Sequence, residues 1–86
     1  MAQLSLGMCY LHGDGVPQDS KEGLRLLKSA ARLGDFNALH NIGVFHQKGT
    51  HGVERNTEMA KKIFAACAEQ GLLQSRLALQ QITAAE

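Results

Sequence analysis

The stretch LGMCYLHGDGVPQD, residues Leu6–Asp19, decides the architecture, because a degenerate copy of it returns later in the chain. It holds a helix with small residues, a glycine turn and the start of a second helix. The pair Leu6-Gly7 recurs as Ile42-Gly43, thirty-six residues further on. A fixed period of this length is typical of a stacked repeat protein. We therefore expect a repeat array and not a globule built around a single site.

The length and composition fit one small folded domain of 86 residues, with 44% hydrophobic and 20% charged residues. Nine Lys and Arg oppose eight Asp and Glu, which gives a formal net charge of +1. A domain that binds a nucleic-acid backbone usually carries a basic excess, so no nucleic-acid partner is expected. No apolar run approaches the roughly 20 residues that span a bilayer, and the N-terminus lacks the features of a signal peptide. Membrane insertion is not expected, and a cytoplasmic location is favoured.

Two cysteines, Cys9 and Cys67, lie in helical stretches of different repeats. Their spacing fits no zinc pattern, and a disulfide-stapled domain would show more cysteines at closer spacing. We interpret both as small buried hydrophobic residues.

Five helices are predicted from apolar periodicity and from the residues that start and stop helices. Asp19, Asp35 and Asn56 are the predicted N-caps, and Glu22 three residues after Asp19 resembles the second half of a capping box. The glycine at position 34 and its counterpart at 71 end the second and fourth helices. The predicted ranges are residues 2–12, 20–33, 36–48, 57–70 and 73–84.

The buried faces follow from the same periodicity, which predicts one apolar stripe on each of the later four helices. Gly7 lies in mid-helix, where glycine costs about 0.5–1 kcal/mol, and this is tolerable if a second helix approaches its backbone closely. In the fifth helix Gln80 stands in the place of Gly7 and Gly43, so no such approach is expected there. The predicted buried residues are Gly23, Leu27, Ala30 and Ala31; Ala38, Ile42, Gly43 and Phe45; Ala60, Phe64, Cys67 and Ala68; and Leu73, Leu77, Leu79 and Ile82.

The predicted organisation is two helical hairpins followed by one closing helix, with repeat one at residues 2–35, repeat two at 36–71 and a capping helix at 72–86. Each hairpin alone leaves an apolar face open, so neighbouring hairpins must stack. At the N-terminal end Leu4, Met8 and Leu11 have no evident cover. This face is expected either to stack on further repeats of a longer array or to be covered by another chain.

The chain resembles the Sel-1-like repeat, a relative of the tetratricopeptide repeat, over nearly its whole length. Gly23 stands where the family has alanine, and His46 stands where the first copy has Tyr10. The matching residues of the first copy are Ala2, Leu6-Gly7, Tyr10, Gly13-x-Gly15-Val16, Asp19, Ala30-Ala31 and Gly34-Asp35. Those of the second copy are Ala38, Ile42-Gly43, Gly49, Gly52-Val53, Ala60, Cys67-Ala68 and Gly71. The glycines that hold structural positions of the repeat are Gly7, Gly13, Gly15, Gly34, Gly43, Gly49, Gly52 and Gly71.

This resemblance implies an all-α fold, a short right-handed α-solenoid that presents a concave groove to protein partners and has no catalytic activity. In such repeats the first helix of each hairpin lines the groove. Four of the residues so placed, from Asn37 to Val44, fall on one helical face, where amide and imidazole groups could bind an extended peptide or a helix. The groove residues implied by position are Leu4, Met8, Leu11, Asn37, His40, Asn41, Val44, Gln47, Gln74, Leu77 and Gln81.

Other chemistry has little support in the sequence. His40 and His46 are six residues apart and so lie on different helix faces, while His12 and His51 belong to separate hairpins. No cysteine or carboxylate cluster has ligand spacing, so neither a metal nor a cofactor is expected. The Gly13-Asp14-Gly15 turn lacks the Lys-Ser/Thr of a phosphate-binding loop. No catalytic set is recognisable, so the chain is not expected to be an enzyme.

The leading functional hypothesis is a non-catalytic interaction module, an adaptor or scaffold that binds a partner peptide or helix in the groove. The alternative is an assembly segment, which joins a longer array or a second copy of the chain through the N-terminal face of Leu4, Met8 and Leu11.

Overall fold

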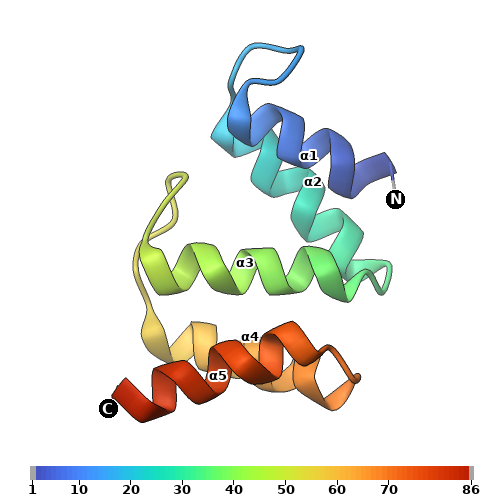
Figure 1. Cartoon of the computed structure of the whole chain (residues 1–86). Coiled ribbons are helices and arrows are strands. Elements are labelled where there is room, and N and C mark those ends of the chain that lie inside the picture. The colour runs from blue at the N-terminus through green and yellow to red at the C-terminus, as the bar shows by residue number, and fades with distance from the viewer. Residues whose placement is uncertain (1, 86) are drawn as a thin grey trace.

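The computed structural model describes residues 2–85, with side chains described from Leu4 onward. Figure 1 shows a stack of helices that follow one another along the chain, with α3 lying between the α1–α2 hairpin and the α4–α5 pair. No strand occurs in this part of the chain. The helices are α1 (Ala2–His12), α2 (Ser20–Arg32), α3 (Phe36–Lys48), α4 (Thr57–Glu69) and α5 (Leu73–Ala85).

The stack is elongated, with principal extents of 38 × 23 × 17 Å. Its helices contact chiefly their neighbours along the chain: α1 with α2, α2 with α3, α3 with α4, and α4 with α5. The predicted all-α solenoid of two hairpins and a fifth helix is thereby confirmed. Within residues 2–85, no helix is long and apolar enough to cross a membrane.

The helix starts follow from local side-chain chemistry, because the first backbone N–H groups of a helix need acceptors. The carboxylate of Asp19 accepts the N–H of Glu22 at 3.2 Å, and the Asn56 side chain accepts the N–H of Met59 at 3.1 Å. Asp35 accepts two N–H groups, at 3.0 and 3.3 Å. All three predicted N-caps are confirmed.

The predicted capping box is wrong in its second half. The Glu22 carboxylate does not bond back to Asp19 but accepts a hydrogen bond of 2.9 Å from Nε of Arg25. The N–H of Asp19 donates instead to the carbonyl oxygen of Tyr10 at 2.8 Å. The second hairpin has the same bond, from the N–H of Asn56 to the carbonyl oxygen of His46, also at 2.8 Å. This pairing closes each hairpin where the turn meets the second helix.

Glycine allows the two helices of each hairpin to approach closely. A Cβ added to Gly7 would lie 3.0 Å from the carbonyl oxygen of Gly23, and one added to Gly43 would lie 2.8 Å from Cε1 of Phe64. Both distances are too short for an ordinary carbon contact. The predicted close approach is confirmed in both hairpins: a Cβ at Gly7 would crowd the backbone of α2, and one at Gly43 would displace the Phe64 ring.

Two apolar clusters form the core. The first joins the first hairpin to α3, and the second joins α4 to α5. The buried members of the first are Leu11, Leu27, Ala30, Ala38, Ile42 and Phe45. Those of the second are Ala60, Phe64 and Ile82. Most of the predicted stripes on α2, α3 and α4 are buried, while Ala31 and Ala68 are half-buried.

The predicted buried face of α5 is wrong for two of its leucines. Leu73 is 62% exposed and Leu77 50% exposed, whereas Ser75 is fully buried and Ile82 nearly so. The small Ser75 stands at the position that Ala38 has in α3, and it faces the interior because a small side chain fits the tight contact with α3 and α4. The helix therefore turns the same face inward as α3 does, and Leu73 and Leu77 face outward, where no described helix covers them.

Candidate partner-binding surface

The surface predicted to bind a partner is carried by α1, α3 and α5, the first helices of successive repeats. Asn37, Gln74 and Gln81 are exposed, and Gln47 is half-buried. None of these four amide side chains forms a hydrogen bond within the part of the chain that the structure describes. We call Asn37, Gln47, Gln74 and Gln81 the amide surface.

His40 points into the fold and links α3 to α5. Its Nδ1 lies 2.8 Å from Oγ of the buried Ser75, and its ring centroid lies 5.2 Å from that of Phe64. Burial lowers the pKa of the His40 imidazole from its ordinary value, because the charged form loses hydration there. The ring is half-buried and its Nδ1 is engaged within the repeat stack.

Two other predicted groove residues also serve contacts between repeats. The Nδ2 atom of Asn41 lies 4.0 Å from Sδ of Met8, which connects α3 with α1. Val44 is half-buried against the second apolar cluster. Asn41 and Val44 therefore lie at the contacts between neighbouring repeats, and the more exposed amide surface surrounds them.

The expected uncovered face of Leu4, Met8 and Leu11 is wrong for Leu11. This side chain is fully buried, and Leu4 and Met8 are half-buried against the first cluster. The reason is Gly23, because the space that a Cβ would fill there is taken by Leu11, whose Cγ lies 2.6 Å from the Cβ position. The large apolar residue exposed on α1 is Leu6, at 44%.

A depression of about 450 Å³ lies where the C-terminal ends of α3 and α5 meet the start of α4. It brings together two members of the amide surface, Gln47 of α3 and Gln81 of α5. Its wall combines both charge signs, a hydroxyl and apolar carbon. The other lining residues are Arg55, Thr57, Glu58, Ile82 and Ala85.

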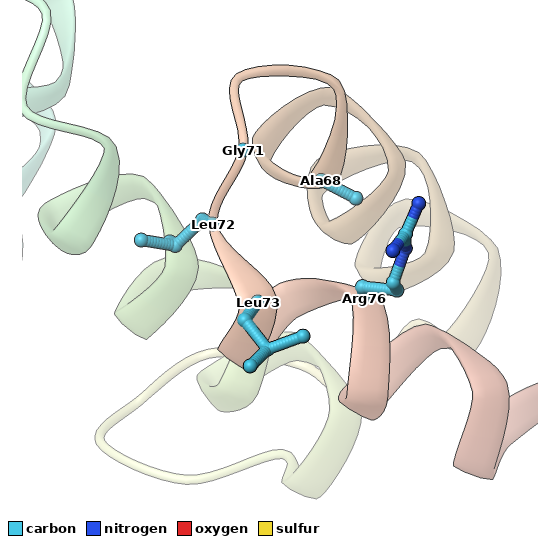
Figure 2. A pocket seen from close by; sticks show the side chains of 5 residues that line it. All are labelled: Ala68, Gly71, Leu72, Leu73 and Arg76. Atoms are coloured by element: carbon cyan, nitrogen blue, oxygen red, sulfur yellow. The ribbon is translucent and has the colours of Figure 1, made fainter.

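A smaller pocket of about 120 Å³ lies at the turn between α4 and α5. Figure 2 shows Leu72 and Leu73 projecting from the turn in different directions, with Arg76 alongside Ala68. None of these residues was predicted to bind a partner. Leu73 in particular was placed in the core by the apolar periodicity of the fifth helix. The pocket lies on the same end of α5 as the exposed leucines.

The structure joins a cysteine, a serine and a histidine that the sequence did not connect. Sγ of Cys67 donates to the carbonyl oxygen of Phe36 at 3.6 Å, and Ser75 also bonds to the thiol. Burial raises the pKa of the Cys67 thiol, with the Ser75 hydrogen bond opposing this. Cys67 and Ser75 are fully buried, so neither can meet a substrate as a nucleophile. With His40 they form a polar link between α3, α4 and α5.

Comparison with known proteins agrees with this architecture. A family model of the Sel1 repeat matches residues 1–35 and 37–72. The crystal structure of a Sel1 repeat protein from Oxalobacter formigenes is similar with a TM-score of 0.83 and 31% sequence identity. The match covers 93% of this chain and 59% of that one. No curated protein matches the chain. Sel1 repeats generally serve as modules for protein–protein interaction. Two matched repeats in register with two structurally equivalent hairpins lead to one conclusion: this chain belongs to the Sel1 repeat family.

Proposed function

We propose that the chain is a non-catalytic adaptor or scaffold module that binds a peptide or helix of a partner protein across the amide surface. The observation that carries this proposal is the set of four amide side chains on α3 and α5 that have no hydrogen-bonding role within the described fold. Each amide can donate and accept, which suits the N–H and C=O groups of a peptide backbone. Exposed Leu77 adds apolar contact area beside them.

The binding mechanism is preorganisation. The helices that carry the amides are fixed by the buried clusters and by the link from His40 to Ser75. Little backbone ordering therefore remains to be lost when a partner binds. The depression between Gln47 and Gln81 would hold one end of the bound segment, with Arg55 and Glu58 able to pair with its charges.

The test is affinity capture from the native lysate, followed by mass spectrometry and titration of the recovered partner. The test variant carries Asn37→Ala, Gln47→Ala, Gln74→Ala and Gln81→Ala. The matched control carries Lys28→Ala, Lys62→Ala and Glu69→Ala, which change exposed residues on the second helices α2 and α4. Both must keep the circular dichroism spectrum of the unchanged chain.

A partner lost with the test variant and retained by the control supports binding at the amide surface. A partner that binds both variants with unchanged affinity rejects it. The same result would direct attention to α5, where Leu73 and Leu77 are exposed.

The second candidate function is assembly, and the exposed leucines of α5 favour it. Leu73 and Leu77 are one helical turn apart, so they form one apolar stripe. We propose that, if the chain assembles, α5 and not the face of Leu4, Met8 and Leu11 provides the contact. Light scattering over a range of protein concentrations tests this. The apparent molar mass of the unchanged chain should rise with concentration, and that of the double variant Leu73→Gln/Leu77→Gln should stay constant.

A further inference from the structure

Two histidines from different repeats meet at the turns of the stack. His12 is the last residue of α1, and His51 lies in the loop between α3 and α4. Their ring centroids are 5.9 Å apart and the ring planes are inclined by 77°. The two turns lie on the same side of the molecule (Figure 1), which lets residues 39 positions apart in sequence come together.

This separation is close to that of two imidazoles on one metal ion. A Zn–N bond is about 2.0–2.1 Å long, so two imidazoles on a tetrahedral ion have ring centres about 5.3 Å apart. The observed separation exceeds this by about half an ångström, which small side-chain rotations can close.

The His51 ring is oriented by its neighbours. Its Nδ1 lies 3.2 Å from Oγ1 of Thr50, and its ring centroid lies 4.6 Å from that of Phe45. A metal-binding histidine usually engages its second nitrogen in such a bond, which leaves Nε2 for the ion. His12 is exposed, and no hydrogen bond to its ring exists within the described residues.

The backbone of His51 is itself unusual. Its φ of 58° makes it the one non-glycine residue with positive φ in the described part of the chain. Such a conformation is uncommon outside glycine and costs conformational energy. Strained backbone of this kind is found most often at functional sites. The loop of the second repeat is one residue longer than that of the first, and the longer loop carries the ring to His12.

We propose that His12 and His51 bind one divalent late transition metal ion of the Zn²⁺ class, with water in the remaining coordination positions. Imidazole suits Zn²⁺, Cu²⁺ and Ni²⁺, whereas Mg²⁺ and Ca²⁺ require oxygen ligands. No group of three or more histidine, cysteine or acidic ligands occurs among the described residues, so the protein supplies two ligands. The bound ion ties the turn of one repeat to the turn of the next. This proposal departs from the expectation of no metal, which rested on the positions of the histidines in the sequence and on the lack of a cysteine or carboxylate cluster with ligand spacing.

The test uses the full chain without an affinity tag, in a phosphine reductant that keeps both thiols reduced. ZnCl₂ is titrated by calorimetry at neutral pH and by NMR of the histidine ring protons, with MgCl₂ as the control ion. The variants are His12→Ala, His51→Ala, Thr50→Ala and Cys9→Ser, together with Lys48→Ala as an exposed control next to the site in sequence. Thermal unfolding with and without ZnCl₂ provides a second readout, because an ion that binds the folded state raises the midpoint.

We expect the ring signals of His12 and His51 to shift with ZnCl₂ while those of His40 stay fixed, and MgCl₂ to have no effect. Loss of second-shell partners weakens metal binding about 10–100-fold, so loss of either direct ligand should cost at least as much. Thr50→Ala should weaken binding by about tenfold, and Lys48→Ala and Cys9→Ser should leave it unchanged.

Three results would overturn the proposal: no saturable ZnCl₂ binding, equal affinity in His12→Ala or His51→Ala, or loss of binding in Cys9→Ser. Because His12 and His51 lie outside the amide surface, either alanine variant should retain the partner captured by the unchanged chain. The metal proposal and the adaptor proposal can therefore fail independently.

Discussion

In the first hairpin α1 packs against α2 over Leu27, whereas in the second α3 packs against α4 over Phe64 at the equivalent position. Both side chains are fully buried. The first hairpin combines Leu11 with Gly23, while the second has Gln47 and Ala60 at these places. The hydrogen bond that closes each hairpin has the same length in both. The two repeats therefore share one backbone arrangement. Within each repeat, the volumes of the side chains that face each other across the hairpin are complementary.

The largest expected effect comes from emptying the equivalent core positions. Phe64→Ala should lower the free energy of unfolding by about 3–5 kcal/mol and Leu27→Ala by about 2–5 kcal/mol. Urea unfolding followed by circular dichroism measures both. Leu33→Ala is the control, because this leucine is 78% exposed and its loss should change stability by less than about 0.5 kcal/mol. Equal, small losses at Leu27 and Phe64 would mean that these side chains do not carry the core.

The local matching of volumes can be broken at Gly23. Gly23→Ala places a methyl group 2.6 Å from Cγ of Leu11 and 2.8 Å from the carbonyl oxygen of Gly7. Overpacking of this kind costs about 1–3 kcal/mol, from which a gain in helix propensity of about 0.5–1 kcal/mol is subtracted. The same change in a Leu11→Ala background should cost less, since the clash with the Leu11 side chain is removed while that with the Gly7 carbonyl oxygen remains. A double-mutant cycle of unfolding free energies measures the coupling, and strict additivity would contradict it.

The N-caps offer a comparison in which the two hairpins should respond alike. Asp19→Ala and Asn56→Ala each remove a single acceptor for a helix N–H, so each should cost about 1 kcal/mol. Their equal effect in thermal or urea unfolding would show that the repeats share one frame. A loss of stability in only one of the two variants would show that the two N-caps have equivalent geometry but unequal energetic importance.

The smallest expected effect is a dependence of stability on pH just below neutrality, which His40 of the second hairpin should cause. His40 has Leu4 at the equivalent place in the first hairpin, and burial lowers the pKa of His40. The unfolded chain, with an imidazole pKa of about 6.5, therefore takes up a proton before the folded one does. The stability contributed by His40 is complete above about pH 6.5, is lost as the pH falls through the folded-state pKa, and then levels off.

Urea unfolding from pH 7.5 to 4.5 tests this in the unchanged chain and in His40→Leu. The free energy of unfolding of the variant should fall less between pH 7.5 and 4.5 than that of the unchanged chain, whatever its absolute value. Identical pH profiles would exclude His40 as the titrating group.

The elements that local chemistry controls were predicted well, and those that depend on another helix were not. The caps at Asp19, Asp35 and Asn56 act within one helical turn, so the sequence predicted the helix starts. The second half of the capping box failed because the N–H of Asp19 has an acceptor on α1, the Tyr10 carbonyl. A sequence pattern cannot reveal an acceptor supplied by the neighbouring helix.

The candidate site was predicted less completely for the same reason. Exposed Asn37, Gln74 and Gln81 follow from the helical period once the repeat is recognised. The burial of Leu11 depends on the missing side chain of Gly23 across the hairpin, and the inward position of Ser75 depends on its fit beside His40. The pair of His12 and His51 arises from an extra loop residue, whose direction no periodicity predicts.

Because the main contacts of each helix are with its neighbours along the chain, this molecule can be described by nearest-neighbour couplings. Contacts of this kind close short loops, and proteins dominated by them fold quickly. Structure can start at either hairpin and spread along the chain, while the end helices α1 and α5 each have a single strong neighbour. Amide hydrogen exchange should consequently be slowest in α2, α3 and α4, which pack against two helices each, and faster in α1 and α5, because opening starts at the ends of the stack.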